Sequence, residues 1–172
     1  AFSEEALDLR RALDDPLLIT DSTYHVGVAA FGGGDLDRSE AAFEDALLLA
    51  RDLGDAMYTA AALCMLGTTA LLKDDLSLVP DRLNKSLAIY TDLADERSRA
   101  ECLCALGGYA AATGHPEEAA RLWGAADAAR GSSPLEYAEP LIEERFMPLL
   151  IEALGVERLP EPQREALSTA LG

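Results

Sequence analysis

The most reactive side chains in this sequence are those of three cysteines and two histidines. Cys102 and Cys104 form a C-x-C pair that could bind a metal ion if both thiolates faced one side. On a helix, however, residues two apart point in divergent directions, and no second pair or nearby histidine completes a set of metal ligands. His25 and His115 lie far apart in the sequence and have no partner that suggests catalysis. We therefore predict no metal site.

Carboxylates are the commonest candidates for acid–base chemistry. Glu143 and Glu144 are adjacent, so on a helix they splay apart, and we expect both on a solvated face. Carboxylates distant in sequence could still converge, which leaves an enzyme as the third hypothesis. The stretch GGGDLDR (32–38) lacks the lysine and the preceding apolar strand of a phosphate-binding loop. We predict no catalytic residue and no cofactor in this segment.

Composition restricts the fold and the partners. The 172 residues are 49% apolar but only 6% aromatic, so the core must be built from alanine and leucine, which favour helices. The net charge of −17 would repel a phosphate backbone, which argues against direct nucleic-acid contact. No apolar run is long enough for a membrane span. The odd number of cysteines and the absence of a signal-peptide pattern predict reduced thiols and a cytoplasmic location.

The positions of these residues follow an internal repeat of about 40 residues. Gly27, Gly67 and Gly107 are in phase, and the aspartates 15, 55 and 95 are in phase with one another. The register extends back to Ala6, so we expect the chain to begin inside a repeat and to be part of a longer protein. The predicted repeats are a partial one at 1–15, followed by 16–55, 56–95 and 96–130.

Each repeat is predicted to contain two helices. The first helices are expected near 16–32, 56–72 and 96–112, and the second helices near 36–53, 76–93 and 116–130. Asp15, Asp55 and Asp95 stand at the N-caps of first helices, and Asp35 and Asp75 at those of second helices. Pro80 predicts a late or irregular start for the helix that contains it.

The only tryptophan occupies a position that the repeat makes interpretable. Trp123 corresponds to Leu83 and Phe43 one and two repeats earlier, which predicts a buried residue rather than a recognition residue. The predicted repeat core has three members in each repeat: Gly27, Phe43 and Ala46; Gly67, Leu83 and Ser86; Gly107, Trp123 and Ala126.

This pattern of small and bulky positions resembles the tetratricopeptide repeat, although the usual period is 34 and Val79 is larger than the pattern favours. The longer period, ALLLARDLGD (46–55), AARLWGAADAAR (119–130) and IEALG (151–155) resemble the carboxy-terminal repeats of large ATP-binding transcriptional regulators, notably actinobacterial ones of LuxR type. The resemblance implies an all-α right-handed superhelix of antiparallel helix pairs. It also implies that the ATP- and DNA-binding parts lie in other domains of the parent chain.

The resemblance further implies that one row of the first helices lines a concave surface. The row comprises Tyr24, Val28 and Phe31; Cys64, Thr68 and Leu71; Cys104, Gly108 and Ala111. We expect this surface to be apolar and suited to a helix or an apolar peptide. A carboxy-terminal helix (about 138–154) or a second copy of the protein could equally fill it. The shared repeat position of Cys64 and Cys104 favours packing over reactivity.

Residues 131–172 lose the repeat, because prolines 134, 140, 148, 160 and 162 interrupt it. We predict that this segment is a helical cap over the last repeat. The function expected from the resemblance is a non-catalytic sensor or inhibitory domain that binds a protein, a peptide or a small-molecule effector. The alternative is a homodimerisation scaffold, in a repeat protein or in a cyclase or kinase fusion, without a ligand of its own.

Overall fold

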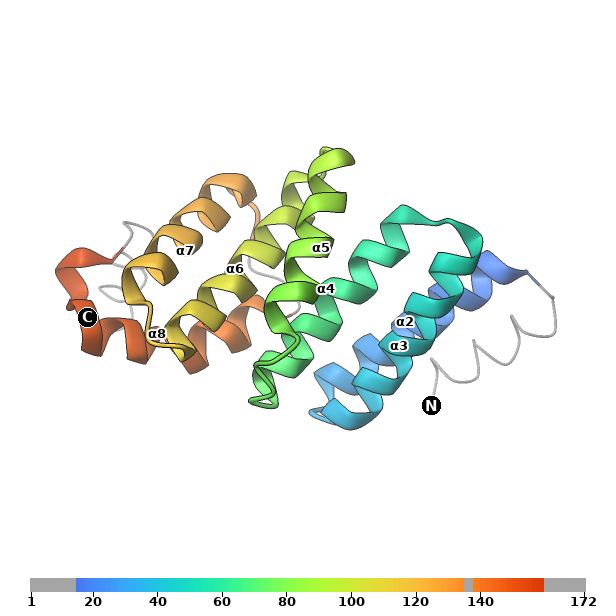
Figure 1. Cartoon of the computed structure of the whole chain (residues 1–172), viewed down its shortest axis with the longest axis horizontal. Helices are drawn as coiled ribbons and strands as arrows, with labels where there is room; N and C mark the ends of the chain where they lie inside the picture. The colour runs from blue at the N-terminus through green and yellow to red at the C-terminus, as the bar shows by residue number, and fades with distance from the viewer. Residues whose placement is uncertain (1–14, 135–137, 160–172) are drawn as a thin grey trace. The chain divides into compact units, whose positions relative to one another are not determined.

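The computed structural model describes residues 15–134 and 138–159, which form helices and connecting turns without strands. The chain divides into two compact units between Leu93 and Ala94. The first unit contains helices α2 to α5, and the second contains α6 to α8 and a short 3₁₀ helix, η1 (Figure 1). The expected partial repeat at 1–15 lies almost entirely outside the described residues, as does the end of the expected cap.

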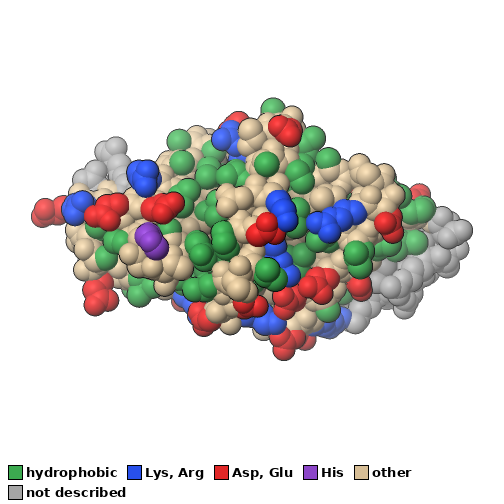
Figure 2. Space-filling view, viewed as in Figure 1, with side chains coloured by type: hydrophobic (Ala, Val, Ile, Leu, Met, Phe, Trp, Pro, Cys, Tyr) green, Lys and Arg blue, Asp and Glu red, His purple; other side chains and the backbone are tan. Residues whose placement is uncertain are grey.

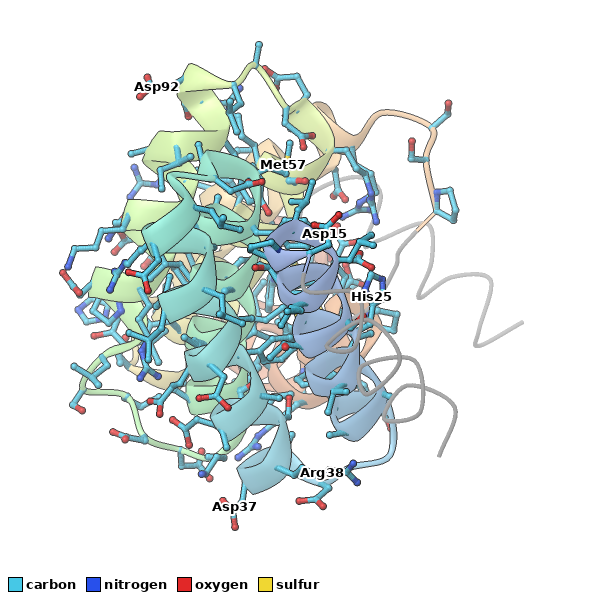
Figure 3. The ribbon with its side chains drawn as sticks, turned by 90° about the vertical axis from the view of Figure 1, so that its right-hand side faces the viewer. Asp15, His25, Asp37, Arg38, Met57 and Asp92 are labelled. Carbon is cyan, nitrogen blue, oxygen red and sulfur yellow. The ribbon has the colours of Figure 1, made fainter. Side chains whose placement is uncertain are left out.

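The first unit is built from two helix pairs. Helices α2 (Pro16–Gly32) and α3 (Leu36–Leu53) form one pair, and α4 (Ala56–Leu72) and α5 (Val79–Asp92) form the other. Helix α3 also packs against α4, so the pairs are in contact. Asp15 and Met57, at the starts of α2 and α4, lie at one end of this unit together with Asp92, at the end of α5 (Figure 3). Asp37, at the start of α3, lies at the opposite end. Both pairs are therefore antiparallel hairpins.

Aspartate side chains fix four of the helix starts. Asp15, Asp35, Asp55 and Asp95 each accept a hydrogen bond from a backbone N–H in the first turn of the helix that follows, as the sequence predicts. Because the first N–H groups of a helix have no partner within it, each cap stabilises its helix by about 1 kcal/mol.

Helix α5 departs from the sequence prediction. We expected it to begin near residue 76 with Asp75 as its cap, and both expectations are wrong, whereas the late start expected from Pro80 is confirmed. Asp75 accepts hydrogen bonds from the backbone N–H (3.4 Å) and hydroxyl (2.8 Å) of Ser77, so its carboxylate belongs to the preceding turn. The helix begins at Val79 without a side-chain cap. Pro80 stands in its first turn, where a missing N–H costs little, so the late start follows from the proline.

The second unit contains one helix pair and one further helix. Helices α6 (Glu96–Ala112) and α7 (Pro116–Arg130) form the pair, and α8 (Glu139–Leu154) packs mainly against α6 and also against α7 (Figure 1). The 3₁₀ helix η1 (Val156–Arg158) follows α8. No helix within the described ranges is both long and apolar enough to cross a membrane.

The two helices of each of the three pairs pack together through the same kind of contact. A glycine on the first helix lies against a large side chain on the second: Gly27 against Phe43, Gly67 against Leu83, and Gly107 against Trp123. A Cβ atom built on these glycines would lie only 2.6, 2.7 and 2.9 Å from the nearest side-chain atom, respectively. All three large side chains are buried. The helices can approach this closely only because the glycines have no side chain.

Smaller residues complete these contacts. Ala46, Ser86 and Ala126, one turn beyond the large side chains, are fully buried. The polar atoms at this level have partners: the Ser86 hydroxyl donates to the Ala60 carbonyl at 2.7 Å, and the Trp123 indole Nε1 donates to the Cys104 carbonyl at 3.0 Å. A buried polar atom without a partner costs free energy, so these bonds allow both residues to lie in the core.

The glycine contact leads to a first prediction. Replacing Gly27 by Ala should lower the free energy of unfolding by about 1–2 kcal/mol, because overpacking against Phe43 exceeds the gain in helix propensity. Gly32→Ala, in the same helix, is the control, since a Cβ there meets no atom within 4 Å and its backbone φ is not positive. Urea unfolding followed by circular dichroism measures both changes. Equal urea midpoints for the two variants would contradict the prediction that the contact of Gly27 with Phe43 leaves no room for a side chain.

Candidate functional site

The residues expected from the sequence to line a concave binding surface lie on helices α2, α4 and α6. In α2, Tyr24 and Val28 are partly exposed and Phe31 is buried. Tyr24 lies in an aromatic group, with ring centroids 5.3 Å from Phe43 and 5.8 Å from Tyr58. In α2, only the exposed parts of Tyr24 and Val28 are therefore accessible to a binding partner.

The rest of the row is buried. Cys64, Thr68 and Leu71 of α4 are at most 4% exposed, which reflects the apolar character of this helix and its packing against both α3 and α5. The equivalent residues of α6, Cys104, Gly108 and Ala111, are also buried. These seven residues, Phe31 included, are buried, so the row is not an open groove in either unit.

The cysteines of the chain are all buried and reduced. Burial raises the pKa of the Cys104 thiol well above its ordinary value, and the nearby carboxylates of Glu143 and Glu139 raise it further. A thiol must ionise to act as a nucleophile or metal ligand, so this environment disfavours both roles. The influence of Glu139 and Glu143 also places Cys104 near the amino-terminal half of α8.

The histidines have local partners. His25 Nδ1 lies 2.8 Å from the Asp21 carbonyl oxygen and 3.3 Å from the Asp21 carboxylate, and its ring is 58% exposed. It projects from the surface of α2 (Figure 3). His115 is the N-cap residue of α7 and lies 3.1 Å from the Thr113 hydroxyl. No group of three or more potential metal ligands occurs in the part of the chain that the structure describes.

Two basic side chains of the first unit, Lys73 and Arg82, are paired with acids. Lys73 Nζ lies 2.6 Å from Asp37 and 2.7 Å from Glu40, and Arg82 contacts Glu40 and Glu44 at 3.5 Å. The hydrogen bond from Lys73 holds the pKa of Asp37 below its ordinary value. Acidic and basic side chains accordingly lie side by side on the face in view (Figure 2). These cations are neutralised locally, so they do not form an anion-binding patch.

The most distinctive chemistry lies in the second unit, where α6, α7 and α8 meet. Glu139, the first residue of α8, is only 1% exposed and accepts hydrogen bonds from two arginines. Arg97 Nη2 of α6 lies 3.0 Å from Glu139 Oε2, and Arg130 Nε of α7 lies 3.2 Å from Glu139 Oε1. Arg130 Nη1 also pairs with Asp127 at 3.0 Å. We call Glu139, Arg97 and Arg130 the carboxylate clamp.

Apolar residues on the same face of α8 continue the contact. Ile142, Phe146, Met147 and Leu150 are each at most 9% exposed and follow Glu139 at helical spacing. The helix is thus attached by a charged contact at its start and an apolar stripe along its length. This arrangement can hold a helix in one register, because sliding it would separate the carboxylate from both arginines.

Glu143 corrects an expectation from the sequence. We expected Glu143 and Glu144 on a solvated face, which is right for Glu144 and wrong for Glu143. Glu143 lies one turn after Glu139 and is partly buried because it shares the inner side of α8. Burial raises the pKa of Glu143, Asp127 of α7 and Glu139 raise it further, and Arg130 opposes the rise. No hydrogen bond or ion pair to Glu143 is found among the described residues.

The carboxylate clamp was missed from the sequence because Glu139 and Arg97 are far apart in the chain. A signal nevertheless exists. Arg97 occupies the repeat position of Leu17 and Met57, and Arg130 that of Ala50 and Tyr90. The third repeat therefore replaces apolar residues by arginine at both positions that contact Glu139.

Comparisons with protein-family models, curated protein sequences and solved structures give no match for the chain. The chemistry of the site is that of one buried carboxylate held by two arginines and followed by an apolar stripe.

The carboxylate clamp gives a second prediction. Glu139→Gln should lower the free energy of unfolding of the second unit by about 3 kcal/mol, since it leaves two partly buried arginines without their shared anion. Trp123, buried between α6 and α7 and the only tryptophan, reports this unit by its fluorescence in urea. The matched control is Glu144→Gln on the exposed side of α8, which should change the stability by less than about 0.5 kcal/mol.

Glu143 gives a prediction about pH. A carboxyl group whose pKa is raised by folding binds protons more readily in the folded state than in the unfolded state. The free energy of unfolding therefore falls as the pH rises from 4.5, the ordinary pKa of a glutamate, through the raised pKa of Glu143. Glu143→Gln removes this loss and should be more stable than the parent near neutral pH. The difference should shrink as the pH falls below 4.5. Midpoints of urea unfolding at several pH values test this; a constant difference would mean that Glu143 does not titrate differently on folding.

Proposed function

We propose that this chain is a non-catalytic repeat domain that binds proteins or peptides, within a multidomain bacterial ATP-dependent transcriptional regulator. The observation that carries the proposal is the contact of a glycine with a large buried side chain, which recurs in three helix pairs at a spacing of about 40 residues. A recurrent contact of this kind is expected when each pair is one layer of a tetratricopeptide-like superhelix. Solenoids of this class present extended surfaces to other macromolecules.

The assignment to LuxR-type or related regulators rests on the ALLLARDLGD, AARLWGAADAAR and IEALG segments. Two of them have clear structural roles. AARLWGAADAAR contains the buried Trp123 and also Arg130 of the carboxylate clamp, and IEALG ends α8. In this proposal, other domains of the parent chain bind ATP and DNA, and the repeats sense an effector in the cytoplasm.

The proposed mechanism is steric and allosteric. An effector, either a protein or a small molecule, binds the resting and active states with different affinities and so shifts the oligomerisation equilibrium of the parent protein. The burial of the thiols and the local pairing of the basic groups support a role in recognition rather than in catalysis. The accessible part of the predicted row is confined to α2, so the effector would have to bind elsewhere or displace a covering element.

A homodimerisation scaffold is the second candidate, and one observation favours it. Leu17, Leu53 and Met57 are 43–50% exposed and belong to the ends of helices that meet at one end of the first unit. Exposed apolar side chains that lie close together favour association. The net charge of −17 opposes self-association through long-range repulsion, which is why we prefer the first candidate.

Sedimentation of the chain from micromolar to near-millimolar concentration separates the two candidates. The proposed receptor domain should remain monomeric. A dimer that Met57→Lys abolishes and Leu149→Lys, at a comparably exposed site on α8, leaves intact would instead establish the scaffold.

The parent coding sequence provides the independent test of the regulator assignment. A phosphate-binding loop and a helix-turn-helix should flank this segment. A flanking cyclase or kinase domain would assign the repeats to a different class of protein.

A further inference from the structure

The face of α6 and α7 that α8 covers indicates what kind of partner the domain would bind, an inference that rests on the proposed function. This face carries two arginines that contact one carboxylate of α8, together with the apolar surface that receives Ile142, Phe146 and Leu150. In the earlier repeats the arginine positions are occupied by apolar residues. The third repeat is thus specialised to receive a helix with an acid in its first turn.

Helix α8 has weaknesses as the occupant of this face. Its N-cap residue, Ala138, has no side chain that can accept a hydrogen bond from the first turn, and Pro148 within the helix lacks the N–H that would continue the helical hydrogen bonds. Glu143 is partly buried beside two like charges, Asp127 and Glu139. A helix with a better N-cap and a neutral residue in place of Glu143 would satisfy the same face with fewer unfavourable contacts.

The connection to α8 is long enough to allow release. Arg130 at the end of α7 is hydrogen-bonded to Glu139 at the start of α8, so the two helix ends are close. Residues 131–138 join them, and a segment of about eight residues can reach about 26 Å when extended. Helix α8 can therefore leave the face without unwinding α7.

We propose that the face of α6 and α7 beneath α8 is a helix-binding surface whose partner is a protein helix with a carboxylate in its first turn and an apolar stripe after it, and that α8 is the built-in competitor. The tethered helix acts at an effective concentration of about 1 mM, as expected for a short linker. A partner helix displaces α8 when its own affinity exceeds this local competition. Release of α8 would then couple partner binding to a change in the surface that the repeats present.

The test uses the full chain and a fluorescein-labelled synthetic peptide of residues 138–159 as the probe. Phe146→Ala in the chain weakens the tethered α8 without altering the receiving helices, because Phe146 is the largest apolar side chain of the α8 stripe. Fluorescence anisotropy should show the peptide binding this variant at least about tenfold more tightly than the parent chain, since the internal competitor is weakened. Binding no tighter than to the parent would overturn the proposal.

Altered peptides test the recognition chemistry. The Glu139→Gln peptide should bind the Phe146→Ala chain at least about tenfold more weakly, and the Glu144→Gln peptide should bind as the unaltered one does. The Glu143→Gln peptide should bind as tightly or more tightly. If Glu139→Gln and Glu144→Gln behave alike, the carboxylate clamp does not select the partner and the proposal fails.

Trp123 emission monitors whether α6 and α7 remain folded when α8 is weakened. Met147→Ala is a milder variant if Phe146→Ala exposes Trp123 to water. If both variants unfold the pair, α8 belongs to the core and cannot be a competitor, which also overturns the proposal. These results are independent of the flanking coding sequence, so a failure here leaves the regulator assignment to its own test.

Discussion

The close approach of two helices at a glycine determines most of this structure. Where Gly27, Gly67 or Gly107 faces a large buried side chain, the backbone of the first helix replaces a side chain as the packing surface. The large side chain then fills the space that a second side chain would occupy, which gives dense packing with few aromatic residues. The same closeness buries the first helices, and above all α4, so residues that would line an open groove in a looser array lie inside the protein.

Local features of the fold could be predicted from the sequence because their causes are local. The aspartates at 15, 35, 55 and 95 cap helices through bonds to N–H groups two or three residues ahead, so spacing alone identifies them. The late start of α5 was expected from Pro80, but Asp75 was wrongly predicted as its cap because two local arrangements compete there. Asp75 can cap a helix or close a turn with Ser77, and Pro80 favours the second by fixing the helix start beyond it.

The candidate site was harder to predict because charge in a sequence does not reveal burial. Glu139 and Glu143 are one helical turn apart in the acidic carboxy-terminal part of the chain, and composition treats them alike. Their environments differ because Arg97 and Arg130 converge on Glu139, whereas Asp127 and Glu139 increase the cost of ionising Glu143. The sequence has one signal of this contact, the arginines at two repeat positions that are apolar in the earlier repeats, and it does not identify the carboxylate that they bind.

The two carboxylates have opposite effects on the attachment of α8. The carboxylate clamp fixes the register and direction of the helix, since one carboxylate must reach arginines from two different helices. Buried ion pairs of this type give specificity more readily than net stability, because desolvation offsets much of the attraction. The apolar stripe supplies the attraction, and the partly buried charge of Glu143 reduces it near neutral pH. The face of α6 and α7 is therefore suited to the exchange of α8 for a partner helix. Such a helix needs only to place a carboxylate and an apolar stripe as α8 does, without a buried charge at the position of Glu143.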